Sequence, residues 1–483
     1  MFGRTARMGV SRWGTPLVAG LLVCACSTMP HQRPEPPPLP TAWQDAPLGA
    51  DLPVTDWWTH FNDPMLNRLE TEALTSGPDV QLALSRLKEA RAQSRSTVAQ
   101  YLPQLTLTGQ GQYTRALDGA SLPSDSGGSE TEQMIGSWGP QVSWEVPLFG
   151  RFGSALAGAR ANSRGAIADV RAARVAVAAD VAQAYVDLRA ARASYVALSQ
   201  QVDSADQLAR ILDTSARAGI TAPADAANAR RLAETARARL PGLEIEARRA
   251  ENVLAVLRGV APGTEPQDVR EAFDASNDVP SIPLNAAPAA PADMLRLRPD
   301  VARAEAQALL AAAALGAARS DLLPQLNLTG MLSASSNLVG TPLPSGEARE
   351  VTAAPLISIP LFDWGQRFAQ VGVRHEQFAQ ALISYKQTVT EAVAEGSNAL
   401  ISLTAGERRL ESSRAAETAA QASDRGSRAS YEAGIQSLAD RLQVQQQLID
   451  ATLSRIDAEH QQASAAIAVY RAFGGGPALE TTR

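Results

Sequence analysis

The segment LPQLTLTG, residues 102–109, decides the fold because it recurs almost unchanged as LPQLNLTG, residues 323–330. Three further pairs keep the same order along the chain: Pro78-Asp79-Val80 with Pro299-Asp300-Val301, Pro147-Leu148-Phe149 with Pro360-Leu361-Phe362, and Ala218-Gly219-Ile220 with Ala433-Gly434-Ile435. Matches that stay in register indicate an internal duplication. Each half is therefore predicted to run helix, strand, strand, long helix, helix.

The repeated segment begins a strand in which apolar and polar residues alternate. Leu105 and Leu107 alternate with Thr106 and Thr108, and the same pattern continues through two predicted hairpins at about 104–147 and 325–361. Alternation over about ten residues is typical of a membrane β-barrel wall. A soluble antiparallel sheet with one wet face gives the same pattern, so the alternation alone leaves both interpretations open.

Four strands are too few for a closed membrane barrel. The smallest barrels have about eight strands, and open edges would leave backbone groups unpaired in lipid. The sequence therefore predicts a partner or several copies, and three copies of four strands would give twelve. After the N-terminus, the best apolar stretch is 309–318, well short of the roughly 18 residues of a membrane helix. Any membrane crossing is thus expected to use strands.

Two very long helices are predicted, from 151 to about 218 and from 363 to about 433. In each, apolar residues recur at alternating spacings of four and three, which indicates a coiled-coil seam. Each helix is expected to end at Gly219 or Gly434, since glycine adopts the left-handed conformation easily. Shorter helices at 223–258 and 438–473 are then expected to run back. Residues 260–299, rich in Pro, Ala and Asp, would form a collar between the halves.

The N-terminus is predicted to be a targeting segment. Arg4, Arg7 and Arg12 precede a short apolar stretch, too short for a membrane helix. It ends in Leu22-Val23-Cys24-Ala25-Cys26-Ser27, which resembles a bacterial lipobox. We expect cleavage before Cys26 and a covalent lipid, including palmitate, on this residue. Both cysteines of the chain lie here, so no disulfide is expected in the mature protein.

Composition and motifs argue against several classes of function. The net charge of −6 gives no basic face for nucleic acid. No catalytic, phosphate-binding or dinucleotide motif is present. The four histidines, at positions 31, 60, 375 and 460, are scattered, and none has a metal-ligand spacing. We therefore expect no enzyme, no metal site and no cofactor other than the lipid on Cys26.

These features together resemble the outer-membrane factor family of tripartite efflux systems, the TolC-like channels, and most closely its lipoprotein branch. The motifs that carry the resemblance are Trp57-Trp58-Thr59-His60-Phe61-Asn62-Asp63-Pro64, Arg298-Pro299-Asp300-Val301 and the paired segments above. The resemblance implies a mainly α fold with a membrane β-barrel part. It implies a homotrimer with a 12-stranded barrel and an α-helical tube in the periplasm. It also implies a passive duct for drugs, metals or other toxic small molecules, served by a periplasmic adaptor and an inner-membrane pump.

The resemblance also implies a gate at the helix tips. Asp440 matches a family aspartate of a constriction ring, while Gln443 replaces a second one; Arg441 is an expected counter-charge, with Arg425 and Arg428 as further candidates. Three carboxylates on a threefold axis would repel one another. The alternative is that Asp440 caps the return helix or lies in water. For its repeat mate Asp225, the cap is the favoured interpretation. Gly219, Asp225 and Gly434 are expected to contact the adaptor.

The predicted organisation follows from these assignments: a signal peptide at 1–25, a lipidated tether at 26–60, a first repeat at 61–258, an equatorial segment at 259–298, a second repeat at 299–473 and a tail at 474–483. Two other functions stay open. The duct could serve type I protein secretion, or the chain could be a lipid-anchored periplasmic coiled-coil scaffold with soluble hairpins.

Overall fold

The duplication is visible in how the chain is divided in space. The computed structural model describes residues 34–43, 50–51, 55–115, 117, 132–264, 267, 269–271, 278–282, 286–287, 291–337 and 348–477. They form two compact units, and each unit takes segments from both repeats. Unit 1 contains Glu89–Arg164 and Glu305–Ser384; unit 2 contains Glu35–Lys88, Gly165–Ala304 and Tyr385–Arg483. The repeats are thus interleaved.

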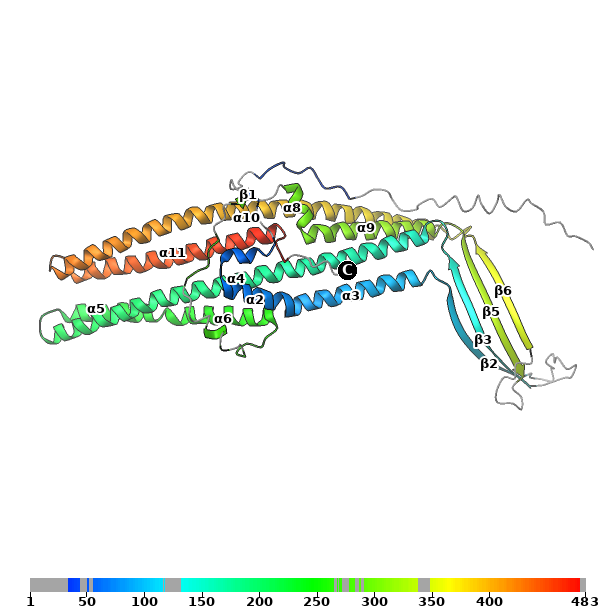
Figure 1. Ribbon diagram of the computed structural model, residues 1–483, viewed down its shortest axis with the longest axis horizontal. Helices are drawn as coiled ribbons and strands as arrows, with labels where there is room; N and C mark the ends of the chain where they lie inside the picture. Colours follow the sequence, from blue (N-terminus) through cyan, green and yellow to red (C-terminus); the bar gives the residue numbers. More distant parts are fainter. Residues whose placement is uncertain are drawn as a thin grey trace, which may run out of the picture. The chain divides into compact units, whose positions relative to one another are not determined.

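Unit 1 contains the four predicted strands as one antiparallel sheet (Figure 1). The strands are β2 (Gln104–Arg115), β3 (Glu132–Val146), β5 (Gln325–Asn337) and β6 (Ala348–Ser358), in the order β2-β3-β5-β6. Their register places apolar residues opposite one another: Leu105 faces Val142, Val142 faces Gly330, and Gly330 faces Ala353. The alternation predicted from sequence therefore gives the sheet one continuous apolar face.

The pairing of β3 with β5 is interrupted at Gly139-Pro140. The register runs from Trp138 opposite Ala334 to Gln141 opposite Met331, and the two residues between have no partner on β5. Proline has no N–H to donate to the ladder. At Gly139 the backbones come so close that a Cβ atom would lie 1.7 Å from the carbonyl oxygen of Leu332. Only glycine fits at this position.

The two long helices have the same length. They are α4 (Arg151–Arg217) and α10 (Gln366–Glu432), each of 67 residues. The predicted seam of α4 is buried except at Tyr195, which is half-buried. Along α10, Val389, Ala392 and Leu403 are buried, and a Cβ on Gly406 would lie 3.4 Å from Cα of Gln462. Small residues on the seam thus let helices approach closely.

The shorter helices α3 (Pro78–Ala99) and α9 (Pro299–Ser320) also match, at 22 residues each. By length and composition α9 could cross a membrane, although no membrane helix was predicted after the N-terminus. Half of its most apolar window is buried within the structure. Core helices of soluble proteins satisfy the same criteria. The buried residues Ala312 and Leu315 of α9 pack against Phe378 of α10, as in a core helix.

The return segment of the first repeat differs from the expectation. The second repeat has one helix, α11 (Leu438–Ala472), as predicted. The first has two, α5 (Pro223–Arg237) and α6 (Leu240–Arg258). The single helix predicted for 223–258 was wrong because Pro241 lies inside it. A proline lacks the N–H for the helical ladder and clashes with the carbonyl four residues earlier.

The family motifs build the core of unit 2. Trp57 is fully buried in the short helix η1 (Trp57–Phe61) and stacks on Tyr470 of α11 at 4.8 Å. Asp63 caps α2 (Pro64–Ser76) and accepts hydrogen bonds from Tyr185 at 2.8 Å and Arg189 at 2.9 Å. The remaining elements are the strands β1 (Ala50–Asp51) and β4 (Ala286–Ala287), which pair in parallel, and helix α8 (Pro291–Leu297).

The N-terminal arm is docked on unit 2 through Trp43. This side chain contacts Phe473 at a centroid distance of 5.5 Å. A Cβ atom on Gly396 of α10 would lie 2.9 Å from the Trp43 ring and 3.3 Å from the sulfur of Met294. Gly396 therefore makes room for the arm. The predicted tether is anchored to the helical body at this point.

Candidate functional site

The two hairpin tips of unit 2 have the same turn. Both glycines adopt the left-handed conformation, with φ of 71° at Gly219 and 73° at Gly434. The next amide in each turn, Ile220 or Ile435, donates to the carbonyl five residues earlier at 2.9 Å. This is the Schellman arrangement, which satisfies the last carbonyls of a helix. The predicted conformation of both glycines is confirmed.

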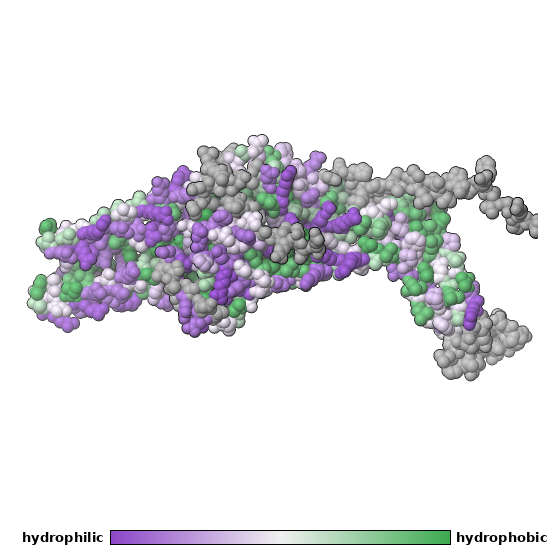
Figure 2. Space-filling view, viewed as in Figure 1, coloured by the Kyte–Doolittle hydropathy of each residue, from purple (hydrophilic) through white to green (hydrophobic). Residues whose placement is uncertain are grey.

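Each turn presents one large apolar side chain to solvent. Ile220 is 77% exposed and Ile435 is 83% exposed. Such isoleucines stabilise nothing within the chain, because burial is the source of hydrophobic stabilisation. The surrounding surface of the hairpins is largely hydrophilic (Figure 2). Each tip therefore offers a single apolar contact point on a polar surface.

Asp440 lies in the first turn of α11 and is exposed. Ser437 is the N-cap: its Oγ accepts from the Asp440 amide at 3.2 Å and donates to the Asp440 carboxylate at 2.7 Å. Its repeat mate Asp225 is also exposed, in the first turn of α5. The N-cap there is Ala222, without a capping side-chain bond. The cap favoured for Asp225 was wrong; its carboxylate only lies near the positive end of the helix.

The expected counter-charges of Asp440 have other partners. Arg441 donates to Asp424 of α10 at 2.5 Å, and both side chains are largely buried. This ion pair ties α11 to α10. Arg428 pairs with Glu432 on its own helix at 3.2 Å. Gln443 is exposed. Within one chain, Asp440 and Gln443 are thus solvent-facing, while Arg441 stabilises the hairpin.

The two hairpins touch each other at the tips. Ala209 and Leu212 of α4 form a small cluster with Ala226 and Ala229 of α5, and Leu438 of α11 packs against it. Leu438 is only two residues from Asp440. The position of the first turn of α11 therefore depends on how α11 lies against α4 and α5.

A polar seam between α4 and α11 continues this contact away from the tips. Gln201 donates to Gln446 at 3.0 Å, and Gln183 donates to Ser464 at 2.9 Å. His460 Nε2 lies 2.7 Å from Asp187 Oδ1. Sequence reasoning missed His460, which it treated as one of four scattered histidines. The only signal was its place on a predicted return helix, and its partner lies 273 residues away.

The apolar face of the sheet is the second candidate site. Leu105 is 72% exposed and Val351 78% exposed, although they lie on the two outer strands of the same sheet. Exposed apolar surface of this extent marks a contact with lipid or protein. Gly111 and Tyr113 continue this face along β2.

Three further predictions concern residues beyond these sites. Cys26, the predicted lipidation site, lies outside the described residues. Among the residues that are described, no group of three or more His, Cys, Asp or Glu is placed to hold a metal ion. Arg298 of the Arg-Pro-Asp-Val motif pairs with Asp300 at 2.7 Å and with Glu395 at 2.6 Å, which makes it a structural residue.

Known proteins are similar to this chain in sequence and in structure. Residues 69–260 and 290–475 match the family described as outer membrane efflux protein. Outer membrane protein OprJ of Pseudomonas aeruginosa is 27% identical over 468 residues, which cover 95% of each chain. Nodulation protein T of Rhizobium leguminosarum bv. trifolii is 26% identical over 471 residues, 97% of this chain and 98% of that protein. The structure of the outer-membrane channel OprN is similar with a TM-score of 0.81 at 26% identity, covering 93% of this chain and 99% of OprN.

Proposed function

The chain belongs to the outer membrane efflux protein family, and from this premise we propose that three copies form one passive duct through which small molecules leave the cell. As a member of the family, the protein works at the outer membrane as the channel component of an efflux system, and its relatives are channel proteins.

The single observation that carries the proposal is the incomplete sheet. Its outer strands β2 and β6 each pair on one side only among the described strands, and its apolar face is exposed. In lipid, an unpaired backbone group costs several kcal/mol, so the sheet edges must meet a partner. Joining β6 of one copy to β2 of the next closes a ring without a new element. Three copies give twelve strands, above the minimum of about eight.

The helical hairpins of the three copies would form the periplasmic tube. Their apolar seams are buried within each chain, and their remaining faces carry Arg, Gln, Asp and Ser that require water. A wall of such hairpins is polar towards its lumen. Nothing in such a wall would drive transport, so an inner-membrane pump and a periplasmic adaptor would supply energy and choose the cargo.

We place the gate at the first turn of α11. Asp440 and Gln443 face solvent there, so a threefold axis close to this turn would bring three Asp440 carboxylates together. Three carboxylates repel one another, so the ring can hold the end closed only when a cation between them or a neighbouring arginine compensates their charge. Without the carboxylates this closing contact is lost. Arg441 would act indirectly, since its ion pair with Asp424 holds α11 on α10.

The adaptor would bind the hairpin tips. Ile220 and Ile435 provide two similar apolar contacts, and Gly219 and Gly434 hold the turns in shape. Asp225 adds a carboxylate beside the first of these turns. Repeated contact points suit a partner that itself binds in several copies around a ring.

We also propose that the mature chain begins at Cys26 with a covalent lipid. The domain boundaries predicted from sequence then give a tether from residue 26 to 60, which reaches the body through Trp43. Mass spectrometry of the N-terminal peptide tests this directly: a Cys26→Ala variant is expected to lose the acylated peptide.

The gate is tested by single-channel conductance of the purified mature protein in a planar bilayer, with Asp440→Ala beside it. We expect a small, mostly closed conductance in the wild type and an open probability at least several-fold higher in the variant. Asp225→Ala is the matched control, because Asp225 has the same position in the first repeat but no Ser N-cap. It should behave like the wild type.

The outcomes separate the parts of the proposal. Equal and clear conductance in all three proteins would keep the duct but remove the gate from Asp440. No conductance in any of them, from protein shown to be folded and inserted, would count against the duct and favour a periplasmic scaffold.

A further inference from the structure

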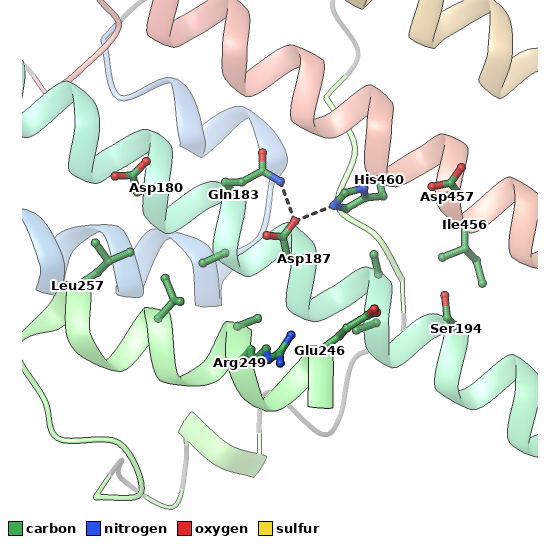
Figure 3. Close-up of a pocket in the computed structure, with 15 residues that line it drawn as sticks. Asp180, Gln183, Asp187, Ser194, Glu246, Arg249, Leu257, Ile456, Asp457 and His460 are labelled. Atoms are coloured by element: carbon green, nitrogen blue, oxygen red, sulfur yellow. Dashed lines mark hydrogen bonds and ion pairs between the residues drawn. The ribbon is translucent and has the colours of Figure 1, made fainter. Parts of the chain in front are cut away.

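A solvent-open groove of about 700 Å³ lies between α4, α6 and α11 in unit 2. Its floor is apolar, formed by side chains such as Ala184, Ala250 and Val253. At one side His460 of α11 and Asp187 of α4 point at each other (Figure 3), with Nε2 and Oδ1 2.7 Å apart. Gln183 of α4 donates to the same carboxylate oxygen at 2.7 Å. The contact joins the two hairpins of one chain.

The charged groups around the imidazole are mostly acidic. Asp187 faces His460 from α4, Glu246 and Arg249 line the groove from α6, and Asp457 lies one turn earlier on α11. Asp180 lines the groove further along α4. The His460 side chain is 30% exposed, so protons reach it through the groove. Asp457 also pairs with Arg409 of α10 at 2.7 Å. Three carboxylates against the two guanidinium groups of Arg249 and Arg409 still make the immediate setting favourable for an imidazolium.

We propose that His460 is a positioning residue for the tip gate: it holds α11 on α4 through Asp187, and periplasmic protons set how firmly it does so. The inference rests on the proposed function, because the gate residue Asp440 lies on the same helix. His460 and Asp440 are 20 residues apart on α11, which is uninterrupted between them. At about 1.5 Å per residue, His460 fixes the helix roughly 30 Å from the gate.

The direction of the pH effect follows from the contacts. The hydrogen bond that His460 donates to the Asp187 carboxylate is the main cause that raises the pKa of His460 above its ordinary value. Burial opposes this shift, and the charges of Asp187, Asp457 and Glu246 add to it. A histidine whose pKa rises on folding stabilises the folded contact fully below its unfolded pKa, near 6.5. That contribution is lost as pH rises through the folded pKa. The contact between α11 and α4 is therefore most stable at acidic pH and becomes less stable towards pH 8.5.

Hydrogen–deuterium exchange of the full-length, detergent-solubilised protein measures the seam without using conductance. Wild type and His460→Gln are compared at pH 6.0 and again at pH 8.5, so that the intrinsic pH dependence of exchange cancels. Glutamine keeps a neutral donor but cannot be charged. We expect peptides from 438–456 and from the facing part of α4 to exchange about two- to fivefold faster in the variant at pH 6.0. At pH 8.5 the two proteins should match.

Two further variants test whether the effect comes from the ion pair of His460 with Asp187. Asp187→Asn should reproduce the loss at pH 6.0, and the double variant should be no worse than either single one, because both remove the same ion pair. His375→Gln changes an exposed histidine of α10 and should change neither peptide. Equal differences between wild type and His460→Gln at both pH values would reduce His460 to a purely structural contact and overturn the inference.

Single-channel recording then links the seam to the gate. Wild-type open probability should rise several-fold from pH 6.0 to pH 8.5. The open probability of His460→Gln should depend less on pH. If exchange follows pH as expected but Asp440→Ala does not alter conductance, the seam is upheld and the gate at Asp440 fails. If Asp440→Ala opens the channel while exchange shows no pH-dependent difference, the gate stands and the role of His460 is wrong.

Discussion

Glu70 is the most unusual single residue of the helical body. It lies on α2, fully buried, and neither carboxylate oxygen has a hydrogen-bond partner in the described part of the chain. Burial raises the pKa of Glu70 well above its ordinary value. The folded protein therefore keeps Glu70 protonated at pH values where the unfolded chain has released the proton. This costs stability as pH rises above the unfolded pKa of about 4.3.

Glu70→Gln should remove this cost, because glutamine has nearly the same shape and no charge to lose. We expect the unfolding temperature to match that of the wild type near pH 4 and to exceed it at pH 8. The gain should grow as pH rises above the unfolded pKa of Glu70, because glutamine has no proton that the unfolded chain can release. Thermal unfolding at both pH values measures it, with the exposed Glu89→Gln as control. A variant less stable than wild type at pH 8 would point to a bound partner of the carboxylate.

At the residue scale, the sequence was enough to predict the glycine turns at the hairpin tips but not the polar contact between α4 and α11. Gly219 and Gly434 were predictable because only local backbone geometry decides them. The role of Ser437 beside Asp440 was also within reach, since a helix N-cap is a local signal. His460 was not, because its meaning depends on Asp187, which is 273 residues away. The contact at Gly396 was out of reach for the same reason: the ring that fills the space beside it belongs to the N-terminal arm.

At the scale of elements, Gly139 controls the pairing of the two repeats. It lies where β3 of the first repeat meets β5 of the second, and its missing Cβ leaves room for the Leu332 carbonyl. Gly139→Ala should push the strands apart and lower stability by about 1–3 kcal/mol or more, the range for overpacking. Gly111→Ala on β2 is the control, because nothing lies within 4 Å of its Cβ position. In thermal melts, Gly139→Ala should unfold at a lower temperature than Gly111→Ala. Equal unfolding temperatures would show that β3 and β5 can move apart to accept the added methyl group.

The elements themselves were largely predictable because periodicity and local breakers decide them. Strand alternation and the seam of α4 and α10 follow from repeating spacings, and both agree with the structure. The break before Pro241 was missed, although proline gives a local signal for it. The strand order β2-β3-β5-β6 was beyond sequence, since it depends on contacts between the repeats.

At the scale of the whole molecule, the proposed trimer makes one geometric demand: β6 of one copy must lie beside β2 of the next. Within one chain, β2 and β6 are separated by β3 and β5. Strands are spaced about 4.8 Å apart, so the outer pair is roughly 14 Å apart. A disulfide spans at most about 7 Å between Cα atoms. A disulfide between β2 and β6 can therefore form only between copies.

Each possible register across that junction places a different residue of β6 beside Leu107 of β2, so cysteine is placed at Leu107 and in turn at Val351, Ala353 or Pro355. All four residues lie on the apolar face. After mild oxidation of membranes, at least one pair should give a covalent ladder that ends at three chains on a denaturing gel. Leu107→Cys with Thr352→Cys is the matched control, because side chains on opposite faces of a sheet cannot meet. The unmutated chain controls for Cys24 and Cys26.

A ladder that continues past three chains would exclude a closed trimer. If every pair stays monomeric in inserted protein, the barrel does not close through these edges, and the soluble-hairpin scaffold returns.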